Sequence, residues 1–285
     1  MTGYAEQTYQ SADGLKLYYR DYGGKSDKPV VLCMPGLTRN SADFEDLAEL
    51  LAPDFRVLCA DQRGRGKSEY AKDSATYSPL TYVEDMKALL AHAGVDKVIL
   101  IGTSLGGLMS MIMAASMADN IQGIIINDIG PDLAPDGISR ILEYIGKARK
   151  FASWEEAAAA IKELQATAFP DLPDARWMDF AKRTCVERND YITTDYDPRI
   201  AEPFKDSDGT PAIDLWPLFD VACQFPLLSL RGEYSDILTE ETFAKMQKRC
   251  LGMKAQTVKR VGHAPILDEP DALSAIRNFL NQFKK

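Results

Sequence analysis

Short apolar segments that alternate with amphipathic segments constrain this chain most, because this alternation decides which kind of sheet it can form. Helix-period sequences at 41–52 and 82–94 lie between apolar runs, and the second ends at Gly94, which is placed as a helix C-cap. The alternation predicts βαβ units and hence a mostly parallel sheet buried on both faces. Five apolar, β-branched runs are the expected strands: 30–34, 56–60, 97–101, 121–126 and 226–230.

Two segments depart from this alternation. Residues 8–23 alternate apolar and polar side chains around Asp13-Gly14, which predicts an antiparallel hairpin at the start of the sheet. Between Gly130 and Leu215 the sequence has helical periodicity with no strand, followed by a loop rich in Asp and Pro. We therefore predict an α/β core from residues 1–130 and 216–285, with a helical insertion at 131–215. The insertion's three predicted helices are 138–151, 153–169 and 174–188.

Composition narrows the class of partner. The net charge of -9 argues against a nucleic-acid partner, which would need clustered Lys and Arg, so we expect a small-molecule substrate. The five cysteines are widely spaced and suggest neither a disulfide framework nor a metal site, and we predict no cofactor. No signal-peptide pattern and no run of ~18 apolar residues occurs, so we expect a cytoplasmic protein without a membrane span.

The stretch VILIGTSLGGLMS (98–110) contains the first candidate for chemistry. Gly102, Ser104 and Gly106 fit the pattern G-x-S-x-G between a predicted strand and a predicted helix. In that setting the serine occupies a sharp, strained turn that exposes its hydroxyl, and side chains larger than hydrogen at the glycines would collide with neighbouring elements. The alternative is a glycine-rich turn in which Ser104 only caps the helix.

A serine nucleophile needs a base, and the chain has two histidines. His92 falls in the last turn of a predicted helix, where a histidine usually only complements the helix dipole. His263 falls in a loop after the last apolar run, far downstream of Ser104. The order serine, acid, histidine favours His263 as the base.

Several motifs together resemble one family. DQRGRGKS (61–68), GTSLGG (102–107), the helical insertion and GHAP (262–265) occur in an order that resembles the α/β-hydrolase fold superfamily with a cap domain, over residues ~10–283. The resemblance implies an eight-stranded, mostly parallel sheet flanked by helices, with a Ser-His-acid triad at the carboxyl ends of the strands. It also implies an oxyanion hole formed by the backbone N–H groups of Leu37 and Leu105. Pro35 stands where a histidine usually precedes Gly36, but the donor follows the glycine, so the hole is compatible with it.

The acid has two candidates. The common family pattern places it three residues after Gly232, which is Ser235 here, with Asp236 one position later. Asp128 follows the strand after the nucleophile helix, where 2-(acetamidomethylene)succinate hydrolases, which the chain resembles in NDIGP and RGExS, carry their acid. We favour Asp128 and keep Asp236 as the alternative, with Asp268 as a further carboxylate if neither serves.

Other residues receive weaker roles. DQRGRGKS lacks P-loop spacing, so we expect no ATP site, and we expect Asp61 and Arg63 to connect loops near the site. Arg39 is a candidate for reading a substrate carboxylate, although a solvated surface arginine is its simpler interpretation. Trp154, Trp177 and Trp216 are candidates for an apolar substrate pocket, although aromatic residues at helical spacing more often form a core.

The leading hypothesis is hydrolysis of a small carboxylic ester, lactone or amide through an acyl-enzyme on Ser104. A serine nucleophile excludes dehalogenase chemistry, which needs a carboxylate at that position. C-C bond hydrolases, perhydrolases and hydroxynitrile lyases share such triads, so these reactions stay open as alternatives. A non-catalytic ligand-binding protein of the same fold is a second alternative, and the sequence leaves the oligomeric state open.

Overall fold

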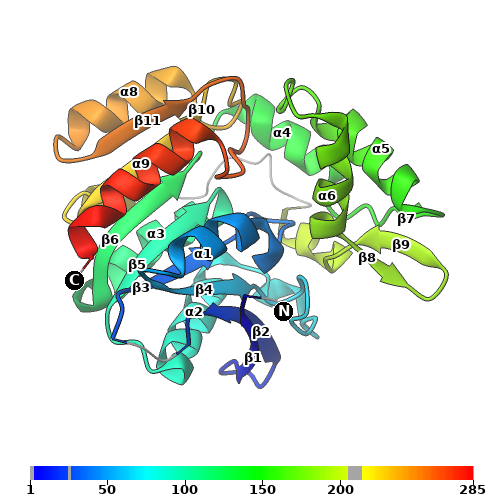
Figure 1. The fold of residues 1–285 in the computed structure, drawn as a ribbon, viewed down its shortest axis with the longest axis horizontal. Coiled ribbons are helices and arrows are strands. Elements are labelled where there is room, and N and C mark those ends of the chain that lie inside the picture. The colour runs from blue at the N-terminus through cyan, green and yellow to red at the C-terminus, as the bar shows by residue number, and fades with distance from the viewer. Residues whose placement is uncertain (1–2, 25–26, 205–213, 285) are drawn as a thin grey trace.

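The central element of this computed structural model, which describes residues 3–24, 27–204 and 214–284, is a twisted sheet (Figure 1). Within these residues the sheet has eight strands in the order β1-β2-β4-β3-β5-β6-β10-β11. The pairs β1–β2 and β2–β4 are antiparallel and the others are parallel, which confirms the predicted mostly parallel sheet. The strands are β1 (Ala5–Gln10), β2 (Lys16–Tyr22), β3 (Val30–Met34), β4 (Arg56–Asp61), β5 (Val98–Thr103), β6 (Ile121–Asn127), β10 (Leu227–Gly232) and β11 (Lys254–Val258).

Local sequence explains the start of the sheet. The predicted hairpin is present: Gln10 pairs with Lys16, and Gly14 in the connecting turn has a φ of +87°, which favours glycine. The helix predicted at 82–94 is present as α2 (Pro79–Ala93), and Gly94 caps its C-terminus with a φ of +66°.

Strand residues alternate between two hydrophobic layers, one on each face of the sheet. Leu32 and Met34 of β3 pack with residues of α2, whereas Val31 and Cys33 pack with residues of α1. The first layer holds α2, α3 (Leu105–Ser116), α7 (Trp216–Ala222) and α8 (Glu240–Arg249), and the second holds α1 (Glu45–Leu51) and α9 (Pro270–Leu280). Because both faces are covered, the central strands are apolar on both sides. Short 3-10 helices occupy Ser41–Phe44, Ser74–Thr76, Ala118–Asn120, Pro198–Phe204 and Asn281–Phe283.

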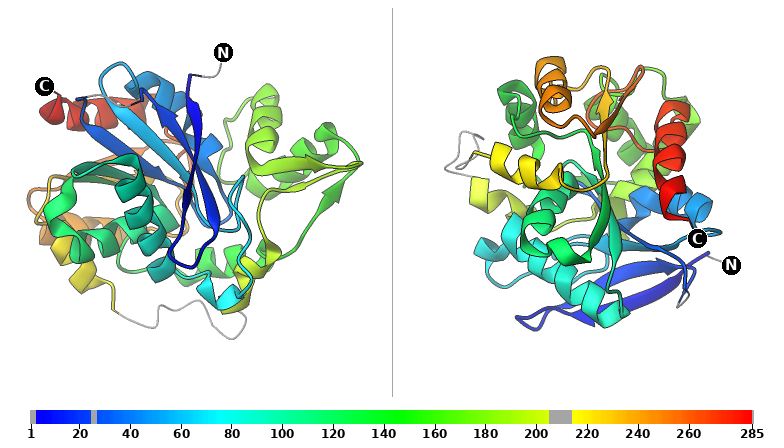
Figure 2. Two further views of the ribbon diagram at one scale, coloured as in Figure 1. Left: turned by 90° about the horizontal axis from the view of Figure 1, so that it is seen from below. Right: turned by 90° about the vertical axis from the view of Figure 1, so that its left-hand side faces the viewer.

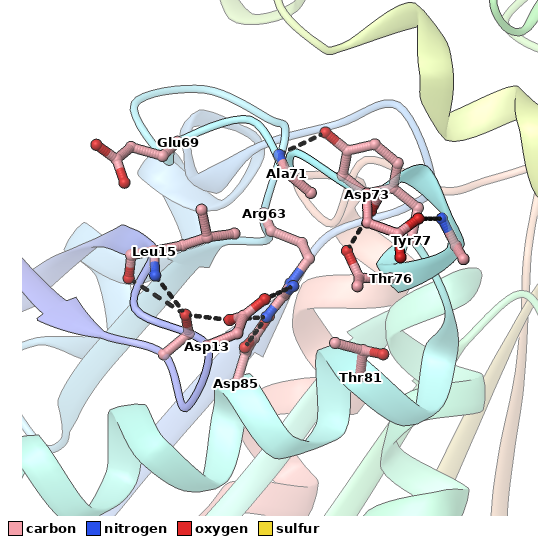
Figure 3. Close-up of polar contacts among 12 residues, drawn as sticks. Asp13, Leu15, Arg63, Glu69, Ala71, Asp73, Thr76, Tyr77, Thr81 and Asp85 are labelled. Carbon is pink, nitrogen blue, oxygen red and sulfur yellow. Dashed lines mark hydrogen bonds and ion pairs between the residues drawn. The ribbon is translucent and has the colours of Figure 1, made fainter.

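The loop after β4 is fixed by a buried arginine. The guanidinium of Arg63 binds both carboxylate oxygens of Asp85 at 2.7 and 2.8 Å and both of Asp13 at 2.8 and 3.0 Å (Figure 3). Arg63 and Asp85 are almost fully buried, so each charge depends on the other for compensation. These bonds join the β1–β2 turn, the β4 loop and α2, as expected for a structural role of DQRGRGKS.

The segment between β6 and α7 contains strands as well as helices, which corrects the prediction of a purely helical insertion. A second sheet, in the order β7-β9-β8, lies in this segment beside the core (Figures 1 and 2). The elements of the inserted segment are α4 (Pro135–Tyr144), β7 (Lys150–Phe151), α5 (Trp154–Gln165), α6 (Asp174–Thr184), β8 (Cys185–Arg188) and β9 (Tyr191–Thr194). The predicted third helix therefore ends at Thr184. Residues 185–188 are extended because they pair with β9 across a turn in which Asn189 has a φ of +54°.

Hydrogen bonds connect this inserted segment to the core. Asp197 N–H donates to the Gly64 carbonyl at 2.7 Å, and the Tyr77 hydroxyl donates to the Asp197 carboxylate at 2.6 Å. The Asn40 amide donates to the Asp195 carboxylate at 3.1 Å. Residues 205–213, most of the predicted loop before Leu215, lie outside the described residues. Among the helices of the described ranges, none combines the length and apolarity required to cross a bilayer.

Candidate active site

Ser104 occupies a strained turn between β5 and α3. Its φ of +51° lies in the left-handed region that non-glycine residues rarely adopt. The neighbouring glycines have no space for a side chain: a Cβ at Gly102 would lie 2.1 Å from the Gly106 carbonyl oxygen, and one at Gly106 would lie 2.0 Å from the Met34 carbonyl oxygen. The Ser104 side chain makes no cap hydrogen bond to α3, so the helix-cap alternative does not describe it. Its hydroxyl is directed toward His263 instead.

The hydroxyl lies in a hydrogen-bonded series with a histidine and a carboxylate. Ser104 Oγ is 2.9 Å from His263 Nε2, and His263 Nδ1 is 2.9 Å from Asp128 Oδ2. Asp128 is fully buried, and the Gly232 N–H donates to its other oxygen at 2.8 Å. The carboxylate is thus held from both sides, and it can fix the orientation and tautomer of the imidazole.

The ends of two parallel strands position these groups. Asp128 follows β6 directly, and its N–H donates to the Leu230 carbonyl of β10 at 2.9 Å. The neighbouring Asn127 accepts the Ser104 N–H at 2.9 Å and donates from its side chain to the Pro265 carbonyl at 2.8 Å. The end of β6 therefore contacts both the serine turn and the histidine loop. Asn127 was not a sequence candidate, and its only signal was its place beside Asp128.

The other candidate groups are engaged elsewhere. Asp236 forms a two-point ion pair with Arg140, at 2.5 and 2.9 Å. Partial burial opposes ionisation of Asp236, but the Arg140 bonds outweigh it and hold the pKa of this carboxyl below its usual value. Asp268 is ion-paired with Arg176. His92 packs against the rings of two tyrosines from β1 and β2, with ring centres 6.4 and 6.3 Å away.

Two backbone amides beside Ser104 are available as hydrogen-bond donors. Leu105 is the first residue of α3, where an N–H has no acceptor within the helix. Leu37 lies in the loop after β3, which is held in place by bonds from Gln62 to the Pro35 carbonyl at 3.1 Å and from Arg65 to the Leu37 carbonyl at 2.9 Å. Among the described residues, neither the Leu37 nor the Leu105 N–H has a protein acceptor.

A cavity of about 140 Å³ opens onto Ser104 and His263 and is lined from both the core and the inserted segment. Its wall combines apolar and aromatic side chains with three arginines, each of which is paired with a carboxylate. Arg39 lines it, and its guanidinium binds Asp43 at two points and lies 4.5 Å from the centre of the Phe180 ring. The other lining residues include Leu37, Phe44, Ile141, Tyr144, Phe169, Leu172, Arg176, Asp179, Arg183, Ile266 and Leu267.

The three tryptophans do not line this cavity, which corrects their proposed place in the substrate pocket. Trp216 is buried against Phe219 in the core, with ring centres 5.8 Å apart. Trp177 is buried in an aromatic group with Phe180, and Trp154 packs at the edge of the same hydrophobic layer. They are structural residues of the core and the inserted segment.

Sequence reasoning missed the charged lining from α6. Arg176, Asp179, Phe180 and Arg183 follow the spacing of one helix face, and all four line the cavity. This spacing was visible in the sequence, but it could not show that the face points toward Ser104. In the described ranges, no group of three or more His, Cys, Asp or Glu side chains is placed to bind a metal ion.

Known proteins match the chain over most of its length. Residues 29–270 match the family described as alpha/beta hydrolase fold. The 3-hydroxybutyrate-oligomer hydrolase of Cupriavidus necator is 35% identical over 273 residues, covering 93% of this chain and 92% of that protein. The 2-(acetamidomethylene)succinate hydrolase of Mesorhizobium japonicum is 26% identical, covering 90% of each chain. A crystal structure of an alpha/beta hydrolase from Novosphingobium aromaticivorans is 48% identical, with a TM-score of 0.94 and 99% of each chain covered.

Proposed function

Because this chain belongs to the α/β-hydrolase fold family, we propose that it is a serine hydrolase that cleaves a small carboxylic ester, lactone or amide through an acyl-enzyme on Ser104. The single observation that carries the proposal is the hydrogen-bonded series from Ser104 through His263 to Asp128, with 2.9 Å at each step, at the wall of a cavity. The nucleophile is within hydrogen-bond reach of the base, and the base is within reach of the orienting acid, as acyl transfer requires.

In the proposed first half-reaction, His263 Nε2 takes the proton of Ser104 as Oγ attacks the substrate carbonyl carbon. The carbonyl oxygen becomes an oxyanion, which the N–H groups of Leu37 and Leu105 stabilise. Asp128 stabilises the imidazolium. When the tetrahedral intermediate collapses, His263 returns the proton to the leaving alcohol or amine, and the acyl group stays on Ser104.

In the second half-reaction, His263 takes a proton from water, and the hydroxide adds to the acyl carbon. Collapse of this second intermediate breaks the bond to Ser104 Oγ, which recovers the proton from His263, and the carboxylic acid leaves. The net reaction consumes one water molecule and needs no cofactor.

Among these substrate classes we favour an ester of a short hydroxy acid. The relative from Cupriavidus necator, which matches over 93% of this chain, is named for hydrolysis of 3-hydroxybutyrate oligomers. A cavity of about 140 Å³ suits a short acyl group better than a long one. We further propose that the inserted segment is the substrate-binding cap, because α4, α6 and the loop before α6 contribute to the cavity wall. A small-molecule substrate and a cytoplasmic location stay predictions.

Turnover tests the proposal directly. The wild-type protein should hydrolyse p-nitrophenyl acetate, p-nitrophenyl butyrate or the linear dimer of 3-hydroxybutyrate, and Ser104→Ala should lower kcat by about 10⁴-fold or more. A panel of lactones and amides in the same assay ranks the substrate classes. If the wild-type protein turned over none of these compounds, or if Ser104→Ala retained full activity, the proposal would fail in favour of C-C bond hydrolysis or ligand binding without catalysis.

A further inference from the structure

The face of α6 that lines the cavity carries two positive charges, Arg176 and Arg183, and one negative charge, Asp179. Arg176 and Arg183 are seven residues apart, which places them on one side of the helix, and Phe180 lies between them. Arg39 adds a third guanidinium from the loop that contains the Leu37 amide. The wall also holds the carboxylates of Asp43 and Asp179, so its three guanidinium groups leave an excess of positive charge, which favours a substrate that combines an apolar body with an anionic group.

Arg39 is bound by its carboxylate partner at two points, whereas Arg176 and Arg183 are each bound, within the described part of the chain, through Nη2 alone. Arg39 gives both Nε and Nη2 to Asp43, at 2.7 and 2.5 Å, and its side chain is 19% exposed. Arg183 binds Asp46 of α1, a half-exposed carboxylate, through Nη2. The Arg39 guanidinium is therefore saturated on one edge, whereas Arg183 is bound through Nη2 alone among the described residues.

Arg176 differs from Arg183 in its exposure and in the place of its partner, because Arg183 is only 22% exposed and binds a carboxylate of α1. The Arg176 side chain is 37% exposed, and among the described residues only its Nη2 has a hydrogen-bond partner, the carboxylate of Asp268. Asp268 lies five residues after His263 in the loop after β11, so this ion pair crosses from α6 to the catalytic loop. Nη2 has a second hydrogen, and Nε and Nη1 have no partner among the described residues, so the edge that Asp268 leaves free, formed by Nη2 with Nε or with Nη1, can bind a second carboxylate at two points.

The ion pair also lies where two cavities adjoin. Arg176 lines the catalytic cavity, whereas Asp268 lines a second cavity of about 270 Å³. The two cavities share the side chains of Phe169, Leu172 and Ile266. An extended substrate that passes along this shared apolar wall from Ser104 would bring its far end to the ion pair.

We propose that Arg176 is the carboxylate-binding residue of the substrate site, and that the enzyme selects esters whose far end carries a free carboxylate. In the free protein Asp268 occupies this position, and the substrate carboxylate displaces it wholly or in part. This inference rests on the proposed serine hydrolase function, and it assigns to that function a class of substrate: monoesters of short dicarboxylic acids, or acyl esters of short hydroxy acids with a free carboxyl group.

The test compares charged substrates with matched neutral ones. The acyl-side series is the mono-p-nitrophenyl esters of succinate, glutarate and adipate, each with its free carboxyl either ionised or methylated. The alcohol-side pair is 3-acetoxybutyrate and its methyl ester. For at least one pair, the wild-type protein should show a kcat/KM for the ionised compound at least tenfold above the methylated one. Arg176→Gln should reduce this ratio by about 10- to 100-fold and change kcat/KM for the methylated compound by less than threefold.

Two further variants separate recognition from a structural role. Asp268→Asn removes the competing carboxylate and leaves Arg176 in place, so the preference should persist and KM for the ionised ester should fall. If the ion pair only held the fold together, Asp268→Asn and Arg176→Gln would instead lower the activity on both members of a pair alike. Arg183→Gln is the matched arginine control, and it should leave the ratio unchanged. Arg176→Lys, which keeps the charge, should restore part of the preference if Arg176→Gln proves poorly folded.

The inference is overturned if no pair shows a preference for the ionised ester, if Arg183→Gln removes the preference while Arg176→Gln keeps it, or if Asp268→Asn behaves like Arg176→Gln. In each of these cases, hydrolysis of the methylated esters by the wild-type protein but not by Ser104→Ala would overturn the role of Arg176 alone and leave the proposed serine hydrolase function standing. If the wild-type protein hydrolysed neither the ionised nor the methylated esters, the proposed function itself would be contradicted.

Discussion

Replacing Asp128 by asparagine should remove most of the activity while leaving the fold intact. The buried carboxylate has two partners, the Gly232 N–H at 2.8 Å and His263 Nδ1 at 2.9 Å. An asparagine in the same position keeps its carbonyl oxygen on the Gly232 N–H, because only an acceptor can satisfy that donor. Its NH₂ group then faces His263 Nδ1 and must donate to it.

This reversal places the imidazole in the wrong tautomer. With Nδ1 accepting, the ring proton moves to Nε2, which then donates toward Ser104 Oγ and can no longer take its proton. The corresponding change in a serine protease triad lowers kcat by about 10⁴-fold, or about 5 kcal/mol of transition-state stabilisation. Because the bond to Gly232 is kept, Asp128→Asn should unfold within a few degrees of the wild-type Tm.

The assay is the steady-state kcat on a p-nitrophenyl ester, together with the amplitude of the pre-steady-state burst that reports the acyl-enzyme. The matched control is Asp236→Asn, which alters a partly exposed ion pair with Arg140 and should change kcat by less than about threefold. The assignment of the acid would be refuted if Asp236→Asn abolished the burst while Asp128→Asn kept near-normal kcat.

Three further changes test the scaffold. Arg63→Gln leaves the buried carboxylate of Asp85 without its cation, and urea denaturation should show a loss of about 3–5 kcal/mol in the free energy of unfolding; a loss below 1 kcal/mol would contradict the structural role of Arg63. Gly106→Ala would place a Cβ 2.0 Å from the Met34 carbonyl oxygen, so Tm should fall by more than about 5 °C, and an unchanged Tm would refute the steric argument. Burial raises the pKa of Asp195 from the usual 3.8 to about 6. Between pH 3.8 and pH 6 the carboxyl is therefore protonated in the folded protein but ionised in the unfolded chain, so the free energy of unfolding falls as the pH rises through this range, and above pH 6 the buried ionised group destabilises the fold. Asp195→Asn should therefore raise Tm at pH 8 but leave it nearly unchanged at pH 4, and equal effects at both pH values would contradict this linkage.

Local sequence patterns predicted the core of the fold well. The strands, the Asp13-Gly14 hairpin and the Gly94 cap depend on the residues in the segment itself, and the structure confirms them. The inserted segment was less predictable because β8 depends on a partner. Residues 185–188 continue a helical periodicity in sequence, and only pairing with β9 makes them extended.

The site shows the same division between local and distant information. The motif around Ser104 and the loop position of His263 are local features, and the structure brings these two residues together. The choice between Asp128 and Asp236 was open because it depends on where two strand ends lie relative to the imidazole. Likewise, the aromatic character of Trp177 could not tell a cavity wall from a buried cluster, and only the structure shows which face of α6 lines the cavity with Ser104.

The central claim, that Ser104 is the nucleophile activated by His263, is tested most directly by intact-mass measurement of the covalent adduct with a fluorophosphonate, followed by peptide mapping. We expect one adduct per chain, located on Ser104, absent from Ser104→Ala and formed at least about 10³-fold more slowly in His263→Ala. An adduct on another residue, or labelling of Ser104→Ala at the wild-type rate, would contradict it.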